Sequence, residues 1–301
     1  MLWPRIMTAM VTPFTDNQEL DERRAENLAA WLVRHGSGGL VIAGTTGESP
    51  TLTEYEREIL YHAARRGAGD VPIFVGTGSN DTRHAVAMAK AAERWGADGL
   101  LVVTPYYNKP SADGLLAHYR AIADSVQLPI MVYNVPGRTG VNMDPRTVQR
   151  LNQACPNVQA IKEAGGQLET IERLLEDCPS MFIYSGDDLL FYPSLAVGAY
   201  GVVSVASHIV GEEMATMCQA FLEGHIDRAR ELHRLLRPVF RDLFAWPNPI
   251  PLKWIMNALG ISVGPLRLPL VFPENTEALD RLYQYITQVV RPDRAGSYAL
   301  V

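Results

Sequence analysis

Eight short apolar runs alternate with helical patterns along the chain, and this alternation constrains the fold more than any other feature of the sequence. The runs begin at residues 6, 40, 71, 99, 128, 158, 181 and 201. The segments between them, such as DERRAENLAAWLVRHG, carry apolar residues at three- and four-residue spacing and end in glycine, a pattern typical of helices. Because the runs are continuously apolar, they favour the strands of a parallel sheet that is covered on its faces.

The number of repeats predicts an α/β fold of the (β/α)₈ TIM barrel class with a C-terminal helical extension. Eight units of roughly thirty residues suit a closed barrel. An open doubly wound sheet is the alternative, but no strand is followed by GxGxxG or GxxxxGK[ST], the usual nucleotide-binding signatures. We expect the strands and most barrel helices in residues 1–210, and the last barrel helix with the extension in residues 211–301. Candidate helices of this second part lie near residues 211–223, 226–244, 249–259 and 274–290.

Composition narrows the class of function. With 301 residues, 47% of them apolar, the chain can bury a large core. A net charge of −6 gives no reason to expect a nucleic acid or an anionic membrane as partner, since both attract clustered Lys and Arg. The start of the sequence lacks a secretory signal pattern, and the three cysteines show no CxxC or zinc spacing. The sequence therefore predicts a cytoplasmic protein that acts on small molecules.

Polar residues gather where the predicted strands end. GTTGES follows the second strand, TPYYNKP the fourth and YNVPGRTG the fifth, while KEA closes the sixth strand and SGDD the seventh. In a barrel of this class the chemistry takes place at the carboxyl ends of the strands. We therefore expect the functional site there.

Lys162 stands at the end of the sixth apolar run, where a charged side chain is expensive to bury. Only four of the 27 basic residues are lysine and the other 23 are arginine. Unlike arginine, lysine can lose its proton and attack a carbonyl group, and burial favours the neutral amine. An ion pair with Glu163 or Asp187 is the structural alternative. Two tyrosines, two threonines and an arginine at the same predicted rim favour a nucleophile.

Two hydroxyl residues in GTTGES suit a carboxylate ligand. Thr45 and Thr46 come too early to cap the helix predicted near Thr53, and Gly44 and Gly47 beside them allow backbone amides to approach a ligand closely. The two threonines therefore favour binding over helix capping.

Tyr133 and Arg138 are candidates for catalysis and binding in YNVPGRTG. Tyr133 is either a core aromatic with a satisfied hydroxyl or a proton shuttle. Arg138 comes just after Pro136 and Gly137, and we expect it on a rigid loop. It is either a surface cation or the partner of a second substrate carboxylate, which a guanidinium grips with two hydrogen bonds. Asp187 and Asp188 have no histidine cluster near them, and Asp188 suits a helix cap, so we expect no catalytic metal.

Together with PNPIPLKW and LRLP, these motifs resemble the dihydrodipicolinate synthase and N-acetylneuraminate lyase superfamily in order and spacing, from MTAMVTPF to LRLP. The resemblance implies a pyruvate-dependent class I aldolase on a (β/α)₈ barrel. More specifically, it implies a lyase of the diaminopimelate route to lysine that condenses pyruvate with L-aspartate 4-semialdehyde through a lysine Schiff base, without a metal or organic cofactor.

The resemblance also implies a role for individual residues. The catalytic set comprises the Schiff-base residue Lys162 and a hydroxyl relay of Thr45, Tyr107 and Tyr133. The substrate-binding set comprises Thr46 for the pyruvate carboxylate, Arg138 for the aldehyde, Gly186 and Val203. Because this family typically supplies Tyr107 across a dimer interface, the resemblance implies a homotetramer built as a dimer of dimers.

A candidate site for inhibition by lysine follows from the same resemblance. Its residues are Ser49, Pro50, Glu54, Arg57, Asn80, His84 and Tyr106. In well-known lysine-sensitive bacterial members a glutamate stands at the position of His84, and histidines stand at those of Glu54 and Arg57. A buried ammonium group needs a carboxylate partner, which a histidine cannot supply. Glu54 is the alternative partner, but Arg57, one helical turn away, would repel the ligand and compete for that carboxylate. We therefore expect weak or absent inhibition.

Three other functions are alternatives to the condensation of pyruvate with L-aspartate 4-semialdehyde. A lyase for a sugar-derived 2-keto acid, such as N-acetylneuraminate or 2-keto-3-deoxygluconate, uses the same lysine chemistry, but its aldehyde has no carboxylate for Arg138. A non-catalytic barrel that binds 2-keto acids would be expected to lose Lys162 or the relay. A pyridoxal phosphate enzyme would need a phosphate-binding loop near strands seven and eight, and none stands out.

Overall fold

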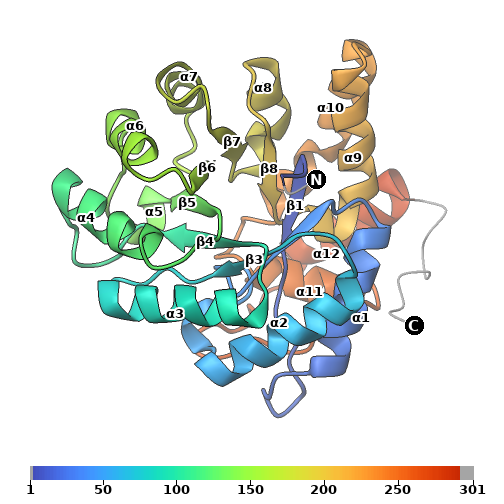
Figure 1. Cartoon of the computed structure of the whole chain (residues 1–301). Helices are drawn as coiled ribbons and strands as arrows, with labels where there is room; N and C mark the ends of the chain where they lie inside the picture. The colour runs from blue at the N-terminus through green and yellow to red at the C-terminus, as the bar shows by residue number, and fades with distance from the viewer. Residues whose placement is uncertain (1–2, 292–301) are drawn as a thin grey trace. The chain divides into compact units, whose positions relative to one another are not determined.

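The computed structural model of the chain describes residues 3–291. The strands in this range form a closed barrel in chain order, from β1 to β8, and the pairs with a defined register are parallel. They are β1 (Ile6–Ala9), β2 (Gly39–Ile42), β3 (Ile73–Gly76), β4 (Gly99–Val103), β5 (Ile130–Asn134), β6 (Val158–Glu163), β7 (Phe182–Ser185) and β8 (Gly201–Ser204). Each apolar run of the sequence coincides with one strand (Figure 1), so the predicted barrel class is confirmed.

Helices follow the strands as the periodicity predicts. They are α1 (Glu22–Arg34), α2 (Glu54–Ala68), α3 (Thr82–Trp95), α4 (Ala112–Ala123), α5 (Pro136–Thr139), α6 (Pro145–Ala154), α7 (Leu168–Asp177), α8 (Phe191–Ala196), α9 (Ser207–Leu222), α10 (Ile226–Asp242), α11 (Ile250–Ala258) and α12 (Glu277–Tyr285). Single helical turns form η1 (Ser49–Thr51), η2 (Asp188–Leu190) and η3 (Ile286–Val290). The short α5 was predicted as a loop. Within residues 3–291, no helix has both the length and the apolarity needed to cross a membrane.

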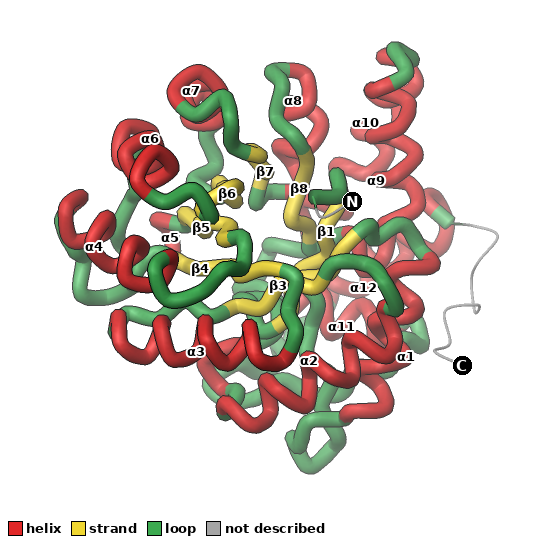
Figure 2. Tube along the Cα trace, viewed as in Figure 1, coloured by secondary structure: helices red, strands yellow, loops and turns green. Residues whose placement is uncertain are grey.

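The chain divides into two compact units. The first unit comprises Met1–Met7 and Pro72–Val203, and the second unit comprises Thr8–Val71 and Ser204–Val301. The division near residue 210, between barrel and helical extension, stays a prediction. Two of the boundaries fall within β1 and β8, and the helices of each unit lie outside its strands (Figure 2).

In the first unit, α3, α4, α6 and α7 follow one another around strands β3 to β7, and each helix contacts the next (Figure 1). Side-chain caps start three of these helices: Asp81 for α3, Ser111 for α4 and Asp144 for α6. Each cap satisfies a backbone N–H that has no partner within its helix. Gly96 ends α3 in a left-handed conformation, at φ 94°, which glycine adopts without steric cost.

An aromatic cluster fills the side of the first unit where the strands begin. Trp3 packs against Phe74 and Phe182, with ring centroids 5.0 and 5.3 Å away. The Tyr184 hydroxyl donates to the Pro4 carbonyl at 2.8 Å, and the Tyr200 hydroxyl donates to the Trp3 carbonyl at 2.6 Å. These contacts tie the segment before β1 to β3, β7 and the residue before β8.

In the second unit, α1 packs on α2, α9 packs on α10, and α12 contacts both α10 and α11. A capping box of Thr53 and Glu56 starts α2. His208 is completely buried: its Nε2 accepts from the Val11 N–H at 3.1 Å, and its Nδ1 lies 2.9 Å from the Val205 carbonyl. These contacts suit the neutral tautomer with the proton on Nδ1, and burial lowers the pKa of His208 to about 4.

Candidate active site

Lys162 and Tyr133 are brought together at the ends of two neighbouring strands of the first unit. They stand opposite each other in the register of β5 and β6, and the Lys162 Nζ lies 4.3 Å from the centre of the Tyr133 ring. Their exposed fractions are only 5% and 6%. Within residues 3–291, neither the Lys162 amine nor the Tyr133 hydroxyl forms a hydrogen bond, and Lys162 has no ion pair. A buried amine that lies beside a tyrosine ring, with no ion pair or hydrogen bond among the described residues, is available for chemistry.

Glu163 does not pair with Lys162, so the structural alternative for the lysine is not found. Successive residues of a strand point to opposite faces of the sheet, and Glu163 faces Asn134 rather than the lysine. Its Oε2 accepts from Asn134 Nδ2 at 2.8 Å, and its Oε1 accepts from the Gly165 N–H at 2.6 Å. Burial raises the pKa of Glu163, against the lowering effect of these two hydrogen bonds.

Asn134 in turn anchors the segment that carries Arg138. Its Oδ1 accepts from the Met143 N–H at 3.0 Å, and its Nδ2 donates to Asn142 Oδ1 at 2.9 Å. The segment thus leaves β5 at Asn134 and is tied back to the same residue at its far end. Between these points Arg138 lies exposed on the short helix α5, rather than on the predicted loop.

Gly186 gives the Lys162 side chain room. It directly follows β7, and a Cβ atom at this position would lie 3.0 Å from Lys162 Cε and 2.6 Å from the Ala164 Cβ. The next residue, Asp187, accepts from the Leu189 N–H at 2.9 Å and caps η2. The prediction that Asp188 provides a helix cap is therefore wrong, since the capping residue is its neighbour Asp187.

Tyr107 stands on the loop after β4 and is 88% exposed. Its backbone is left-handed, at φ 72°, and its N–H donates to the Thr139 carbonyl at 3.1 Å. The neighbouring Asn108 side chain donates to the Asn80 carbonyl at 2.9 Å. An aromatic side chain is therefore presented to solvent by a constrained backbone.

In the second unit, Thr46 is almost fully buried and its Oγ1 accepts from Asn248 Nδ2 at 2.9 Å. Since the amide occupies the oxygen as a donor, the Thr46 O–H is left to donate to another acceptor. Thr45 is half-buried, and its hydroxyl has no hydrogen-bond partner in the described chain. A Cβ at Gly47 would lie 3.1 Å from the Met10 carbonyl oxygen, so packing against the protein requires this glycine.

The remaining candidate residues are divided between the units. Val203 is fully buried in β8. In the first unit His84 is exposed, Asn80 is half-buried and Tyr106 is 40% exposed. In the second unit Glu54 is exposed, and the guanidinium of Arg57 donates to the Ser49 carbonyl at 2.8 Å and to its hydroxyl at 2.9 Å. The candidate lysine site as a whole stays a prediction.

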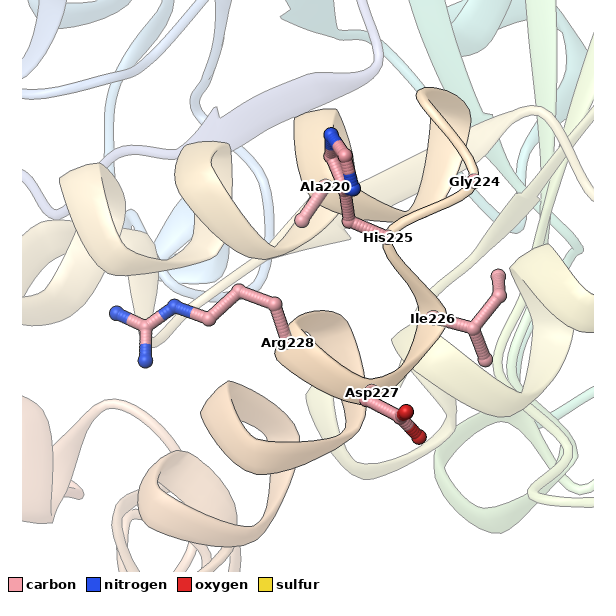
Figure 3. Close-up of a pocket in the computed structure, with 6 residues that line it drawn as sticks. All are labelled: Ala220, Gly224, His225, Ile226, Asp227 and Arg228. Atoms are coloured by element: carbon pink, nitrogen blue, oxygen red, sulfur yellow. The ribbon is translucent and has the colours of Figure 1, made fainter.

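A surface hollow of about 490 Å³ lies at the turn between α9 and α10 (Figure 3). Its lining residues are Ala220, Gly224, His225, Ile226, Asp227 and Arg228. The charged side chains in Figure 3 point in different directions and do not converge on one point. The hollow contains none of the predicted site residues. Within residues 3–291, no group of three or more His, Cys, Asp or Glu side chains is placed to hold a metal ion.

The sequence pattern of the dihydrodipicolinate synthetase family matches residues 3–289. The chain belongs to this family. It is 51% identical over 270 residues to the 4-hydroxy-tetrahydrodipicolinate synthase of Cyanothece sp., covering 89% of this chain and 92% of the relative. It is 49% identical over 273 residues to the synthase of Moorella thermoacetica, covering 90% and 93%. The crystal structure of the synthase from Cyanidioschyzon merolae with lysine bound superposes with a TM-score of 0.90 at 42% identity, covering 94% of this chain and 97% of that one.

Sequence reasoning missed several residues that support the family's motifs in this chain. Asn248 and Lys253 belong to PNPIPLKW, which was noted only as a motif and a helix start. The sequence also gives no sign that Asn134 and Glu163 together anchor the segment that carries Arg138. The sequence does carry a signal for Lys253, because it is one of only four lysines and lies in a helix whose other residues are apolar except for Asn257.

Proposed function

We infer that this chain is a lyase that condenses pyruvate with L-aspartate 4-semialdehyde to give 4-hydroxy-tetrahydrodipicolinate, in the diaminopimelate route to lysine. Relatives named for this activity are about half identical to the chain over nine-tenths of its length. The structural observation that carries the proposal is the buried amine of Lys162 beside the Tyr133 ring, without an ion-pair partner among residues 3–291. An amine of this kind is suited to form an imine with a 2-keto acid.

The reaction begins with attack of the Lys162 amine on the ketone carbon of pyruvate. Loss of water gives a protonated imine, which draws electrons from the neighbouring methyl carbon, so that removal of a methyl proton gives an enamine. The enamine carbon attacks the aldehyde carbon, a new carbon–carbon bond forms, and the aldehyde oxygen becomes a hydroxyl. The amine of the second substrate then attacks the imine carbon, which closes the ring and releases Lys162.

The hydroxyl residues move the protons in this proposal. Tyr133 stands opposite Lys162 in the register of β5 and β6, and its hydroxyl is not engaged elsewhere within the described residues. Thr45 and Tyr107 complete the relay, which typically contributes about 10²- to 10⁴-fold in rate. Thr46 binds the pyruvate carboxylate with the hydroxyl proton that Asn248 leaves available. Arg138 binds the carboxylate of the aldehyde substrate, and Gly186 and Val203 line the substrate site.

We also propose that the protein is a homotetramer built as a dimer of dimers. Tyr107 supports this proposal, since a relay residue that is 88% exposed in a single chain needs a neighbour to exclude water from it. A cytoplasmic location stays a prediction from the sequence.

Borohydride reduction in the presence of pyruvate tests the central step. Reduction of the imine should add a pyruvate-derived mass to the peptide that contains Lys162 and to no other lysine peptide. Labelling of Lys109 or Lys253 instead, or no labelling, would contradict the mechanism. Turnover with pyruvate and each candidate aldehyde then separates the synthase from a lyase for sugar-derived 2-keto acids, which the names of the relatives do not favour.

A further inference from the structure

A buried ion pair joins the loop that carries Thr46 to helix α11. Lys253, on α11, places its Nζ 2.6 Å from Glu48 Oε1, and the two side chains are 0% and 1% exposed. Glu48 follows Thr46 by two residues, in the last part of GTTGES. The proposed mechanism gives neither residue a role.

The pair is part of a network that joins distant segments of the second unit. The Glu48 Oε2 accepts from the Arg267 N–H at 2.9 Å, and the Lys253 ammonium donates to the Pro265 carbonyl at 2.9 Å. The ring of Phe14 lies between two cations, with Lys253 Nζ at 4.2 Å and Arg267 Cζ at 4.1 Å from its centre. The motifs PNPIPLKW and LRLP thus meet GTTGES at one carboxylate.

The loop needs an external constraint of this kind. Glu48 has a left-handed backbone, at φ 55°, and so does Ala43 at the other end of the loop, at φ 50°. A residue with a side chain is strained in this conformation, which persists only where the surroundings hold it. The Thr46 contact with Asn248 comes from the same PNPIPLKW segment as Lys253.

Stability alone does not account for the pair. Removing two charges from water is expensive, and a buried ion pair can often be replaced by apolar residues without loss of stability. Charge compensation does account for it. Without Lys253, a buried Glu48 carboxylate would stand two residues from a hydroxyl that binds a substrate carboxylate, and it would repel that substrate.

We propose that the Glu48–Lys253 ion pair is a positioning device for the pyruvate-binding loop: it holds the loop that presents Thr46 and cancels the negative charge behind it. This inference rests on the proposed function, because the ligand of Thr46 is taken to be the carboxylate of pyruvate. Neither Glu48 nor Lys253 touches the reacting atoms.

Three variants test the proposal: Lys253→Met, Glu48→Gln and the double variant. For each, the pyruvate concentration that gives half-maximal borohydride trapping on Lys162 is measured, and KM is measured for pyruvate and for the aldehyde. Lys253→Met leaves the carboxylate uncompensated, so its half-maximal concentration should rise about 10- to 100-fold. Glu48→Gln should give a smaller rise, because an amide leaves no repelling charge. The double variant should recover much of the loss of Lys253→Met, while KM for the aldehyde changes little in all three.

Glu213→Gln is the matched control for general destabilisation. Glu213 pairs with the buried Arg291 at 2.5 Å in the same unit, away from GTTGES. This variant should lower the melting temperature and leave the pyruvate dependence as in the wild type. If Lys253→Met does not fold, the pyruvate dependence of Glu48→Gln and of the double variant still tests the proposal.

Two results would overturn the proposal while the wild-type protein still labels at Lys162. One is an unchanged pyruvate dependence in the folded variants. The other is an equal rise in KM for both substrates. Absence of labelling in the wild type would instead remove the proposed function itself, so the two failures are distinguishable.

Discussion

Replacing Gly186 with alanine should damage imine formation by displacing Lys162. The added Cβ would lie 2.6 Å from the Ala164 Cβ and 3.0 Å from Lys162 Cε, whereas carbon atoms in contact prefer about 3.5 to 4.0 Å. The contact with the Ala164 Cβ strains the backbone after β6, and the contact with Lys162 Cε is relieved by movement of the flexible lysine side chain. The amine must therefore shift by about 0.5 to 1 Å, a displacement that can reduce a rate about 100-fold.

The assay is the rate of borohydride trapping on Lys162 at saturating pyruvate, with the melting temperature measured on the same samples. A 100-fold loss corresponds to about 2.7 kcal/mol of activation free energy. Gly137→Ala is the matched control, because no heavy atom lies within 4 Å of an added Cβ there, and it should label at the wild-type rate. A folded Gly186→Ala variant with the wild-type trapping rate would refute the steric reasoning.

Four further outcomes are expected. Arg138→Ala should lower kcat/KM for the aldehyde roughly 30- to 100-fold by removing a charged hydrogen-bond partner, and should leave pyruvate trapping intact; equal loss in both would contradict the assignment. Tyr107→Phe should lower turnover about 100-fold, and dilution to monomers should act in the same direction, so a fully active monomer would count against the interface role. Because burial lowers the pKa of His208 from 6.5 to about 4, its contribution to stability is complete above pH 6.5 and is lost as the pH falls towards 4, by up to about 3 kcal/mol. Thermal melts from pH 7.5 to 5 should therefore show a weaker pH dependence in His208→Asn than in the wild type. Lysine should inhibit weakly or not at all, since Arg57 donates to Ser49 within the candidate site; strong inhibition in an initial-rate titration would show that an altered site survives.

The barrel was predictable because the alternation of apolar runs and helical patterns repeats along the sequence. Eight apolar runs with helical segments between them leave few alternatives, and the strand ends then point to Lys162. The short helix α5 was not predictable in the same way, because its four residues include both proline and glycine. The start of α9 at Ser207, rather than near residue 211, was also missed, since the buried Val205, Ala206 and Ile209 extend the mainly apolar pattern of β8 into the helix.

The site was predictable only where a residue type alone limits the chemistry. A lysine at the end of an apolar strand has few uses, whereas the roles of Asn134, Gly186 and Asn248 depend on partners that a single sequence does not reveal. Asn248 bonds to Thr46 across 202 positions of the chain. No local sequence pattern specifies such a contact, because only folding brings Thr46 and Asn248 together.

The two-residue period of a strand separates reactive from supporting groups that are neighbours in sequence. Tyr133 and Lys162 share one face, and Asn134 and Glu163 share the other. A substitution at Glu163 therefore acts on the first unit through the Arg138 segment, by way of Asn134, even though Glu163 is bonded directly to the lysine residue. Proximity in sequence is thus a poor guide to function at these strand ends, and the register of the strands is a better one.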